Sequence, residues 1–163
     1  MTAAGTVVWF TGLPASGKST LAERVRDRLR RAAVILDSDA MRDVLEASSY
    51  AADDRERFYR VLANLAANLA HQGIVVLVAA TAQRRAFRAL ARAHAPHFVE
   101  VWVRTPADQC AQRDVKGLYA RASAGEIALP GVAVPYEPPT HPDVVAEGGL
   151  DEAALGQILA LVE

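Results

Sequence analysis

The sequence contains a single cysteine, Cys110. One thiol cannot form a disulfide within the chain, and it cannot be half of a Cys-x-x-Cys site. The four histidines, His71, His94, His97 and His141, have no cysteine or histidine partner at the spacing of metal ligands. The sequence therefore excludes a fold stapled by internal disulfides and gives no signal for a zinc site. We expect Cys110 to be an ordinary apolar residue on a helix.

Neither an excess of charge nor a long apolar run is present. Lys and Arg number 18 against 19 Asp and Glu, for a net charge of −1, which gives no field that recruits nucleic acid or an anionic membrane. The longest apolar stretch, residues 74–80, is far shorter than the roughly 20 residues that span a bilayer. Residues 1–5 have no charged side chains and do not lead into a signal-peptide pattern. We therefore expect a cytoplasmic protein that binds neither nucleic acid nor membranes.

Strands and helices alternate along the chain. Apolar runs predict five strands, at residues 6–11, 33–36, 74–78, 98–103 and 143–146. Helical spacing predicts helices at residues 19–31, 41–47, 53–71, 84–94 and 151–162, and another that starts at Pro106. This order predicts an α/β fold in which helices cover both faces of a parallel sheet. Because no repeat or linker divides the chain, we expect residues 1–163 to form one domain.

Residues 114–142 show little periodicity and are rich in glycine, proline and charge. A loop of this length inside a compact domain is usually functional or disordered. Leu118, Tyr119, Ile127 and Tyr136 offer apolar anchors along it. We therefore predict that this segment is an ordered lid over an active site.

A phosphate-binding loop follows the first predicted strand. It reads Gly12-Leu13-Pro14-Ala15-Ser16-Gly17-Lys18-Ser19-Thr20, and a predicted helix begins at its end. The glycines allow backbone N–H groups to point at phosphate oxygens, and the helix N-terminus adds positive charge. We expect Lys18 to reach the β- and γ-phosphates, Ser19 to ligate Mg²⁺, and Thr20 to lie near the α-phosphate.

The loop predicts a bound nucleoside triphosphate without defining its use. A GTPase would carry an Asn-Lys-x-Asp motif late in the chain, and the sequence has none. A signalling ATPase of bacterial type would end a second apolar strand on aspartate, whereas Ala79-Ala80-Thr81 follows Val78. An ATP-dependent kinase fits best, and a regulatory protein that binds nucleotide without catalysis is the alternative.

Two carboxylates, Asp37 and Asp39, follow the second predicted strand. Ligands of parallel sheets gather at the carboxyl ends of the strands, where a carboxylate can accept a hydroxyl proton or hold Mg²⁺ through water. Arg42 can bind an anionic acceptor beside them. The alternative is that Ser38 or Asp39 merely caps the next helix.

Four arginines, Arg84, Arg85, Arg88 and Arg92, lie on the predicted helix at residues 84–94. We expect most of them on its solvated face. Arg84 or Arg85 could instead reach an acceptor anion, since both closely follow the carboxyl end of a strand.

Five motifs together resemble the adenylylsulfate kinase family over nearly the whole chain. They are Val8-Trp9-Phe10-Thr11-Gly12-Leu13, Leu36-Asp37-Ser38-Asp39 with Arg42, Gln112-Arg113-Asp114-Val115-Lys116-Gly117-Leu118-Tyr119, Ala124-Gly125-Glu126-Ile127, and Pro135-Tyr136-Glu137 with Pro139. The resemblance implies a three-layer P-loop kinase with a five-stranded parallel sheet and a lid, often dimeric. It also implies transfer of the γ-phosphate of Mg·ATP to the 3′-hydroxyl of adenosine 5′-phosphosulfate.

The resemblance implies roles for individual residues. Asp39 corresponds to the carboxylate that orients or deprotonates the acceptor hydroxyl, with Asp37 in support. Arg42 and Arg55 correspond to arginines that contact the acceptor nucleotide. In the lid, Lys116 lies near the acceptor and shares its motif with Leu118, and Arg113 lies where the lid covers ATP.

The sequence departs from the family pattern on the acceptor side. Ser38 replaces a glycine, Tyr50 a phenylalanine, and Phe58 an asparagine that holds the acceptor nucleotide. The segment Ala82-Gln83-Arg84-Arg85 replaces Ser-Pro-Tyr-Arg, and Leu129-Pro130-Gly131-Val132 replaces a Phe-Thr-Gly-Ile stretch whose phenylalanine stacks on adenine. Two hypotheses follow. The same substrate is held with Leu129 and Phe58 as apolar walls, or the scaffold phosphorylates another hydroxyl.

Overall fold

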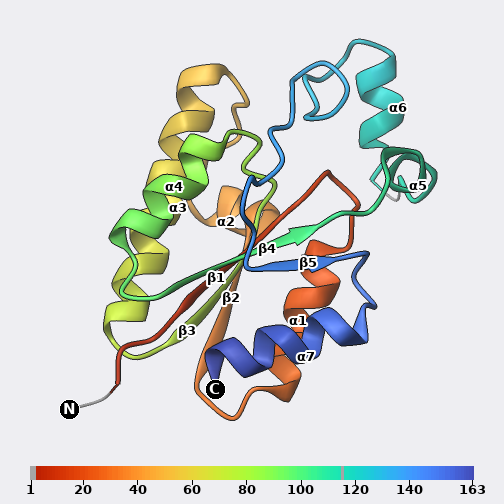
Figure 1. Ribbon diagram of the computed structural model, residues 1–163. Coiled ribbons are helices and arrows are strands. Elements are labelled where there is room, and N and C mark those ends of the chain that lie inside the picture. The colour runs from red at the N-terminus through yellow and green to blue at the C-terminus, as the bar shows by residue number, and fades with distance from the viewer. Residues whose placement is uncertain (1–2, 115) are drawn as a thin grey trace.

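Five parallel strands form the central sheet in the order β2-β3-β1-β4-β5 (Figure 1). The computed structural model describes residues 3–114 and 116–163. The strands are β1 (Val7–Thr11), β2 (Ala33–Asp37), β3 (Val75–Ala79), β4 (Phe98–Val103) and β5 (Val144–Ala146). In the central strand β1, Val8 and Phe10 face one core cluster while Val7 and Trp9 face the other. This alternation is the two-residue period of a strand buried on both faces.

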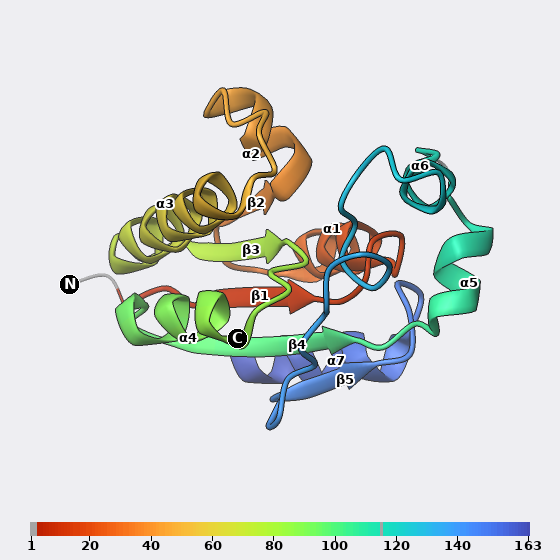
Figure 2. The same cartoon turned by 90° about the horizontal axis from the view of Figure 1, so that it is seen from above.

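Helices cover both faces of the sheet (Figure 2). On one side lie α1 (Lys18–Arg28) and α7 (Glu152–Val162), and on the other α3 (Ala52–His71) and α4 (Arg85–His94). The shorter helices α2 (Ser38–Val44), α5 (Ala107–Gln112) and α6 (Leu118–Ser123) lie toward the carboxyl ends of the strands. Because β1 runs between β3 and β4, the loop that follows it emerges at the middle of that edge, where ligands of such sheets bind.

The predicted α/β fold with a five-stranded parallel sheet is confirmed. The expectation that residues 33–36 form a buried strand is wrong for most of β2, in which only Leu36 is buried, because this strand lies at an edge of the sheet. The predicted helix at 41–47 instead begins at Ser38, where the Asp37 carboxylate accepts a hydrogen bond from Asp39 N at 3.0 Å. Asp37 therefore caps this helix, whereas Ser38 and Asp39 lie inside its first turn.

Residues 114–142 are more regular than the sequence indicates. They contain α6, whose Tyr119 and Ala122 pack with Cys110 of α5 and with Leu129 in a small separate core. Val115, which belongs to one of the motifs above, lies outside the described residues, as do Met1 and Thr2. Cys110 is fully buried, and burial raises the pKa of its thiol, as expected of an apolar packing residue. In the described part of the chain, no helix is both long and apolar enough to cross a membrane.

Three of the four arginines, Arg84, Arg85 and Arg92, are exposed as expected, and Arg88 is the exception. Its side chain is 2% exposed, and Nε lies 3.2 Å from Oε2 of Glu100 on β4. Burial raises the pKa of the Glu100 carboxyl, and the nearby Arg88 guanidinium opposes that shift. We expected arginines on the surface because burying an unpaired charge costs free energy. Helical spacing could not predict that Glu100, on β4, would pair with Arg88.

We predict that Glu100→Ala lowers the free energy of unfolding by about 3 kcal/mol, because it leaves the Arg88 charge buried without its partner. The exposed pair between Arg104 and Glu147 supplies the control. There Glu147→Ala should change stability by no more than about 0.5 kcal/mol. Urea unfolding followed by circular dichroism measures both variants, and equal losses would contradict the prediction.

Candidate active site

The carboxyl ends of the strands open into a cavity of about 880 Å³. Its walls come from the loop after β1, the start of α2, the start of α3 and the chain around α6. Most of the predicted site residues line it: Pro14, Ala15, Ser16, Gly17, Lys18, Ser19, Thr20, Asp37, Asp39, Arg42, Tyr50, Arg55, Arg113, Lys116, Leu118 and Leu129. The structure thus brings both halves of the predicted site to one cavity, while Gly12 and Phe58 lie behind its lining.

Close backbone approaches explain the glycines of the phosphate-binding loop. Gly17 caps α1 with a φ of 102°, and a Cβ there would lie 2.6 Å from Gly149 N. A Cβ on Gly12 would lie 2.5 Å from the carbonyl oxygen of Val103 on β4. Gly12 therefore serves the packing of the loop against the sheet, whereas Gly17 permits the turn into the helix.

Lys18 folds back over its own loop. Its Nζ donates hydrogen bonds to the carbonyl oxygens of Gly12, at 3.1 Å, and Leu13, at 2.8 Å. Burial lowers the pKa of this ammonium to about 8, although Asp37 and Asp39 partly offset that effect. Because the folded-state pKa lies below 10.5, the charged lysine reduces stability at lower pH, and this cost fades as the pH rises from about 8. A phosphate group at this place would restore the ordinary basicity of Lys18.

Oxygen donors suited to Mg²⁺ meet beside Lys18. Ser19 Oγ donates a hydrogen bond to Asp37 Oδ2 at 2.5 Å, and both residues line the cavity. Mg²⁺ prefers hard oxygen ligands and is commonly held by one or two protein groups together with phosphates and water. The residues present therefore fit the ion that the sequence predicts, with Ser19 as a candidate direct ligand and Asp37 as a candidate partner through water.

The chain around α6 closes the cavity from the opposite side. Lys116 Nζ makes an ion pair with Asp39 Oδ2, and this hydrogen bond raises the pKa of Lys116. Tyr119 Oη donates to the carbonyl oxygen of Pro14 at 2.7 Å, and Arg55 Nη2 donates to that of Ala128 at 3.1 Å. These contacts join the predicted lid to the phosphate-binding loop, to α2 through Asp39 and to α3 through Arg55.

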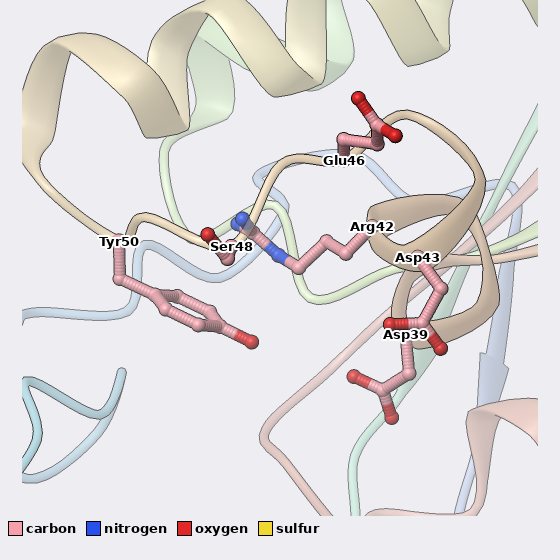
Figure 3. A pocket seen from close by; sticks show the side chains of 6 residues that line it. All are labelled: Asp39, Arg42, Asp43, Glu46, Ser48 and Tyr50. Carbon is pink, nitrogen blue, oxygen red and sulfur yellow. The ribbon is translucent and has the colours of Figure 1, made fainter.

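Arg42 is held between two aromatic rings. Its Cζ lies 4.0 Å from the centre of the Tyr50 ring and 4.1 Å from that of Phe58. Arg42 Nη1 also donates to the carbonyl oxygens of Ala47 and Ser49. Figure 3 shows Arg42 reaching toward Tyr50 in a hollow that borders the main cavity. Such stacking fixes a guanidinium in place.

Phe58 differs from its expected role as an apolar wall of the acceptor site. Its side chain is 2% exposed and belongs to the core beneath Arg42. Helical geometry accounts for this position, because Phe58 shares the buried face of α3 with Leu62 and Ala66. Leu129, by contrast, lines the cavity, so one of the two expected walls is present there.

Comparison with known proteins gives the fold and the cavity a context. The family described as Adenylylsulphate kinase matches residues 4–147. The chain belongs to this family. An adenylyl-sulfate kinase of Chloroflexus aurantiacus is 45% identical over 148 residues, which cover 88% of this chain and 80% of that protein. One from Picosynechococcus sp. is 38% identical over 153 residues, covering 91% and 86%.

A solved structure extends the likeness to the arrangement of the elements. The Mycobacterium tuberculosis APS kinase CysC, solved in complex with AMPPNP and APS, superposes with a TM-score of 0.88 at 38% identity. The likeness covers 97% of each chain. The resemblance to adenylylsulfate kinases and the P-loop kinase fold inferred from the sequence are therefore both confirmed.

Several residues lining the cavity of this adenylylsulfate kinase family member were missed by the sequence interpretation. Tyr59, Thr81 and Gln83 line its floor, and Tyr59 Oη accepts a hydrogen bond from Ala82 N at 3.0 Å. Tyr59 has the apolar spacing of a core residue, so its polar end gave no separate signal. Thr81 and Gln83 follow β3, and the rule that ligands gather at the carboxyl ends of strands was the one available indication.

We predict that binding of Mg·ATP takes up about half a proton per site at pH 8, because phosphate oxygens raise the lowered pKa of Lys18. Uptake should vanish near pH 6.5, where Lys18 is already charged. Calorimetric titration in buffers of different ionisation enthalpy measures it. The matched control is Lys18→Arg, which keeps the charge but does not titrate, and equal uptake by this variant would refute the assignment to Lys18.

Proposed function

We propose that this chain is an adenylyl-sulfate kinase, which transfers the γ-phosphate of ATP to the 3′-hydroxyl of adenosine 5′-phosphosulfate. The observation that carries the proposal is the meeting of a phosphate-binding loop with Asp39, Arg42 and Lys116 around one cavity. The family and its members support the choice of reaction and substrate. We also infer that residues 1–163 act as one kinase domain, and that the enzyme works in the cytoplasm, with a homodimer as the candidate assembly.

The donor side would bind the triphosphate of ATP. Backbone N–H groups of the loop from Ala15 to Gly17 and the N-terminus of α1 would surround the β- and γ-phosphates, with Thr20 near the α-phosphate. Lys18 would exchange its two carbonyl partners for phosphate oxygens. Mg²⁺ held by Ser19 would neutralise charge on the phosphates during transfer. We place Arg113 over the nucleotide, since it lines the cavity from the beginning of the lid.

The acceptor hydroxyl would lie against Asp39. The oxygens of Asp37 already accept from Ser19 Oγ and Asp39 N, which commits that carboxylate to the donor side and to the helix cap. Asp39 has Lys116 as its partner, in a pair whose side chains are 62% and 57% exposed. A pair so exposed is weak, so an entering hydroxyl can displace the lysine from the carboxylate. We therefore assign the orientation and deprotonation of the hydroxyl to Asp39.

Positive and apolar groups would hold the rest of the acceptor. Arg42 and Arg55 would bind its anionic part, and the exposed Tyr50 ring offers a surface for stacking. Leu118 and Leu129 would close the apolar side, while Phe58 acts from below by fixing Arg42. Closure of residues 114–142 would keep water away from the phosphate during transfer.

A second candidate is a kinase of the same scaffold that acts on another hydroxyl. It is favoured by the replacement of an aromatic lid residue by Leu129 and by the position of Phe58 behind Arg42. Both changes remove contacts to a base while the positive groups remain. The distinction therefore concerns the acceptor and leaves the donor chemistry unchanged.

We expect rapid ADP release with adenosine 5′-phosphosulfate in a coupled assay that also contains Mg·ATP. Other nucleotide conjugates and hydroxylated metabolites form the comparison panel. Identification of 3′-phosphoadenosine 5′-phosphosulfate by mass spectrometry establishes the product. Turnover with another acceptor alone would support the second candidate, and ATP binding without any phosphorylated product would favour a regulatory protein.

We predict that Asp39→Asn lowers kcat by about 100-fold or more, because the amide cannot accept the hydroxyl proton. The affinity for ATP should change little. Asp53→Asn, in the exposed first turn of α3, is the matched control and should retain full activity. A folded Asp39→Asn enzyme with normal turnover would remove this residue from the mechanism.

A further inference from the structure

The hydroxyl of Thr11 joins four parts of the molecule. Thr11 is fully buried at the end of β1, directly before the phosphate-binding loop. Its Oγ1 lies 2.6 Å from the carbonyl oxygen of Thr81, 2.9 Å from Tyr136 Oη and 2.9 Å from Arg88 Nη1. These partners belong to the loop after β3, to the end of the predicted lid and to α4.

Counting protons fixes the direction of each hydrogen bond. A threonine hydroxyl has one hydrogen and two lone pairs. The hydrogen of Thr11 goes to the Thr81 carbonyl, which can only accept. Tyr136 and Arg88 must therefore both donate to Thr11, and burial raises the pKa of the Tyr136 phenol so that it keeps its proton. The Thr11 hydroxyl is then saturated, and it has no spare capacity for water or substrate.

The same network fixes the backbone beside Tyr136. Arg88 Nη2 donates to the carbonyl oxygen of Glu137 at 2.6 Å, and Glu137 N donates to that of Gln83 at 2.8 Å. Glu100 in turn holds Arg88. The contact near the beginning of the lid between Lys116 and Asp39 is of another kind, since this pair is largely exposed to water. Buried contacts therefore hold the carboxyl end of this segment, in addition to the bond from Tyr119 to Pro14 near its beginning.

We propose that Thr11 is a positioning residue, whose hydroxyl anchors the carboxyl end of the lid to the beginning of the phosphate-binding loop. This inference rests on the proposed kinase function, in which the lid closes over both substrates. The anchor gives the lid and the donor loop a common fixed point at Thr11. When the lid closes, Lys116 and Leu129 are then correctly positioned relative to the phosphates of ATP.

Kinetics of matched variants test the anchor. Thr11→Val removes the hydroxyl at nearly constant volume, Thr11→Ser keeps it, and Tyr136→Phe removes one donor. The control is Thr6→Val, the same change at a buried threonine just before β1. We expect Thr11→Val and Tyr136→Phe each to lower kcat/KM for the acceptor about tenfold, with the Kd of ATP within about twofold of the parent value. Thr11→Ser should restore activity.

Because Thr11 and Tyr136 act through their shared hydrogen bond, the double variant should have the same kcat/KM for the acceptor as the less active of the two single variants. Hydrogen exchange with a non-hydrolysable ATP analogue supplies a readout without acceptor, in which residues 130–137 should exchange faster in both variants. Three results would each overturn the proposal. They are a double variant in which the two losses of kcat/KM multiply, hydrogen exchange at residues 130–137 that does not change, and a loss that is confined to ATP affinity. Should Thr11→Val fail to fold, Tyr136→Phe carries both measurements. An inactive parent enzyme would refute the kinase function, while the exchange measurement would still judge the anchor.

Discussion

The buried ammonium of Lys18 is the constraint around which the site is arranged. Inside the loop it has two carbonyl oxygens as partners, and burial still lowers its pKa to about 8. At neutral pH most of this lysine is still charged, but carbonyl dipoles offset its burial only in part, whereas phosphate would supply a full opposing charge. The two nearby aspartates keep the lysine protonated enough to meet the nucleotide. The cavity is thus prepared for anions by its charges before any ligand enters.

The two aspartates near Lys18 differ in their hydrogen-bond partners. Asp37 is engaged by Ser19 and by the first turn of α2, so its geometry is fixed by the fold. Among the described residues, the Asp39 carboxylate has its partner across the cavity, in Lys116 of the lid. One carboxylate is therefore part of the scaffold, and we propose that the other changes partner when the acceptor arrives. Asp37 caps α2 and Asp39 lies in its first turn, so the start of this short helix separates the two chemical roles.

Much of this arrangement could be predicted from short segments of sequence. Gly12 and Gly17 identify the conformation of the phosphate-binding loop from local sequence. Asp37 and Asp39 come at the end of a strand, so the topology of a parallel sheet places them beside that loop. Arg88 and Thr11 could not be assigned in the same way. Their partners lie 12 and 125 residues away, at Glu100 and Tyr136, and nothing in helical or strand spacing indicates that such distant polar groups will meet. The tertiary fold determines the positions of Arg88 and Thr11 and their partners.

Phe58 shows a different limit, because its type was read correctly as apolar while its place was not. The ring supports the underside of Arg42, with Tyr50 on the other face. A cation held over an aromatic ring gains about 0.5–1 kcal/mol when exposed and about 2 kcal/mol or more when desolvated. This is comparable to a hydrogen bond that an amide in its place would make to a base. We therefore expect the exchange to favour binding of the acceptor's negative charge over recognition of its base, so that charge dominates acceptor selection.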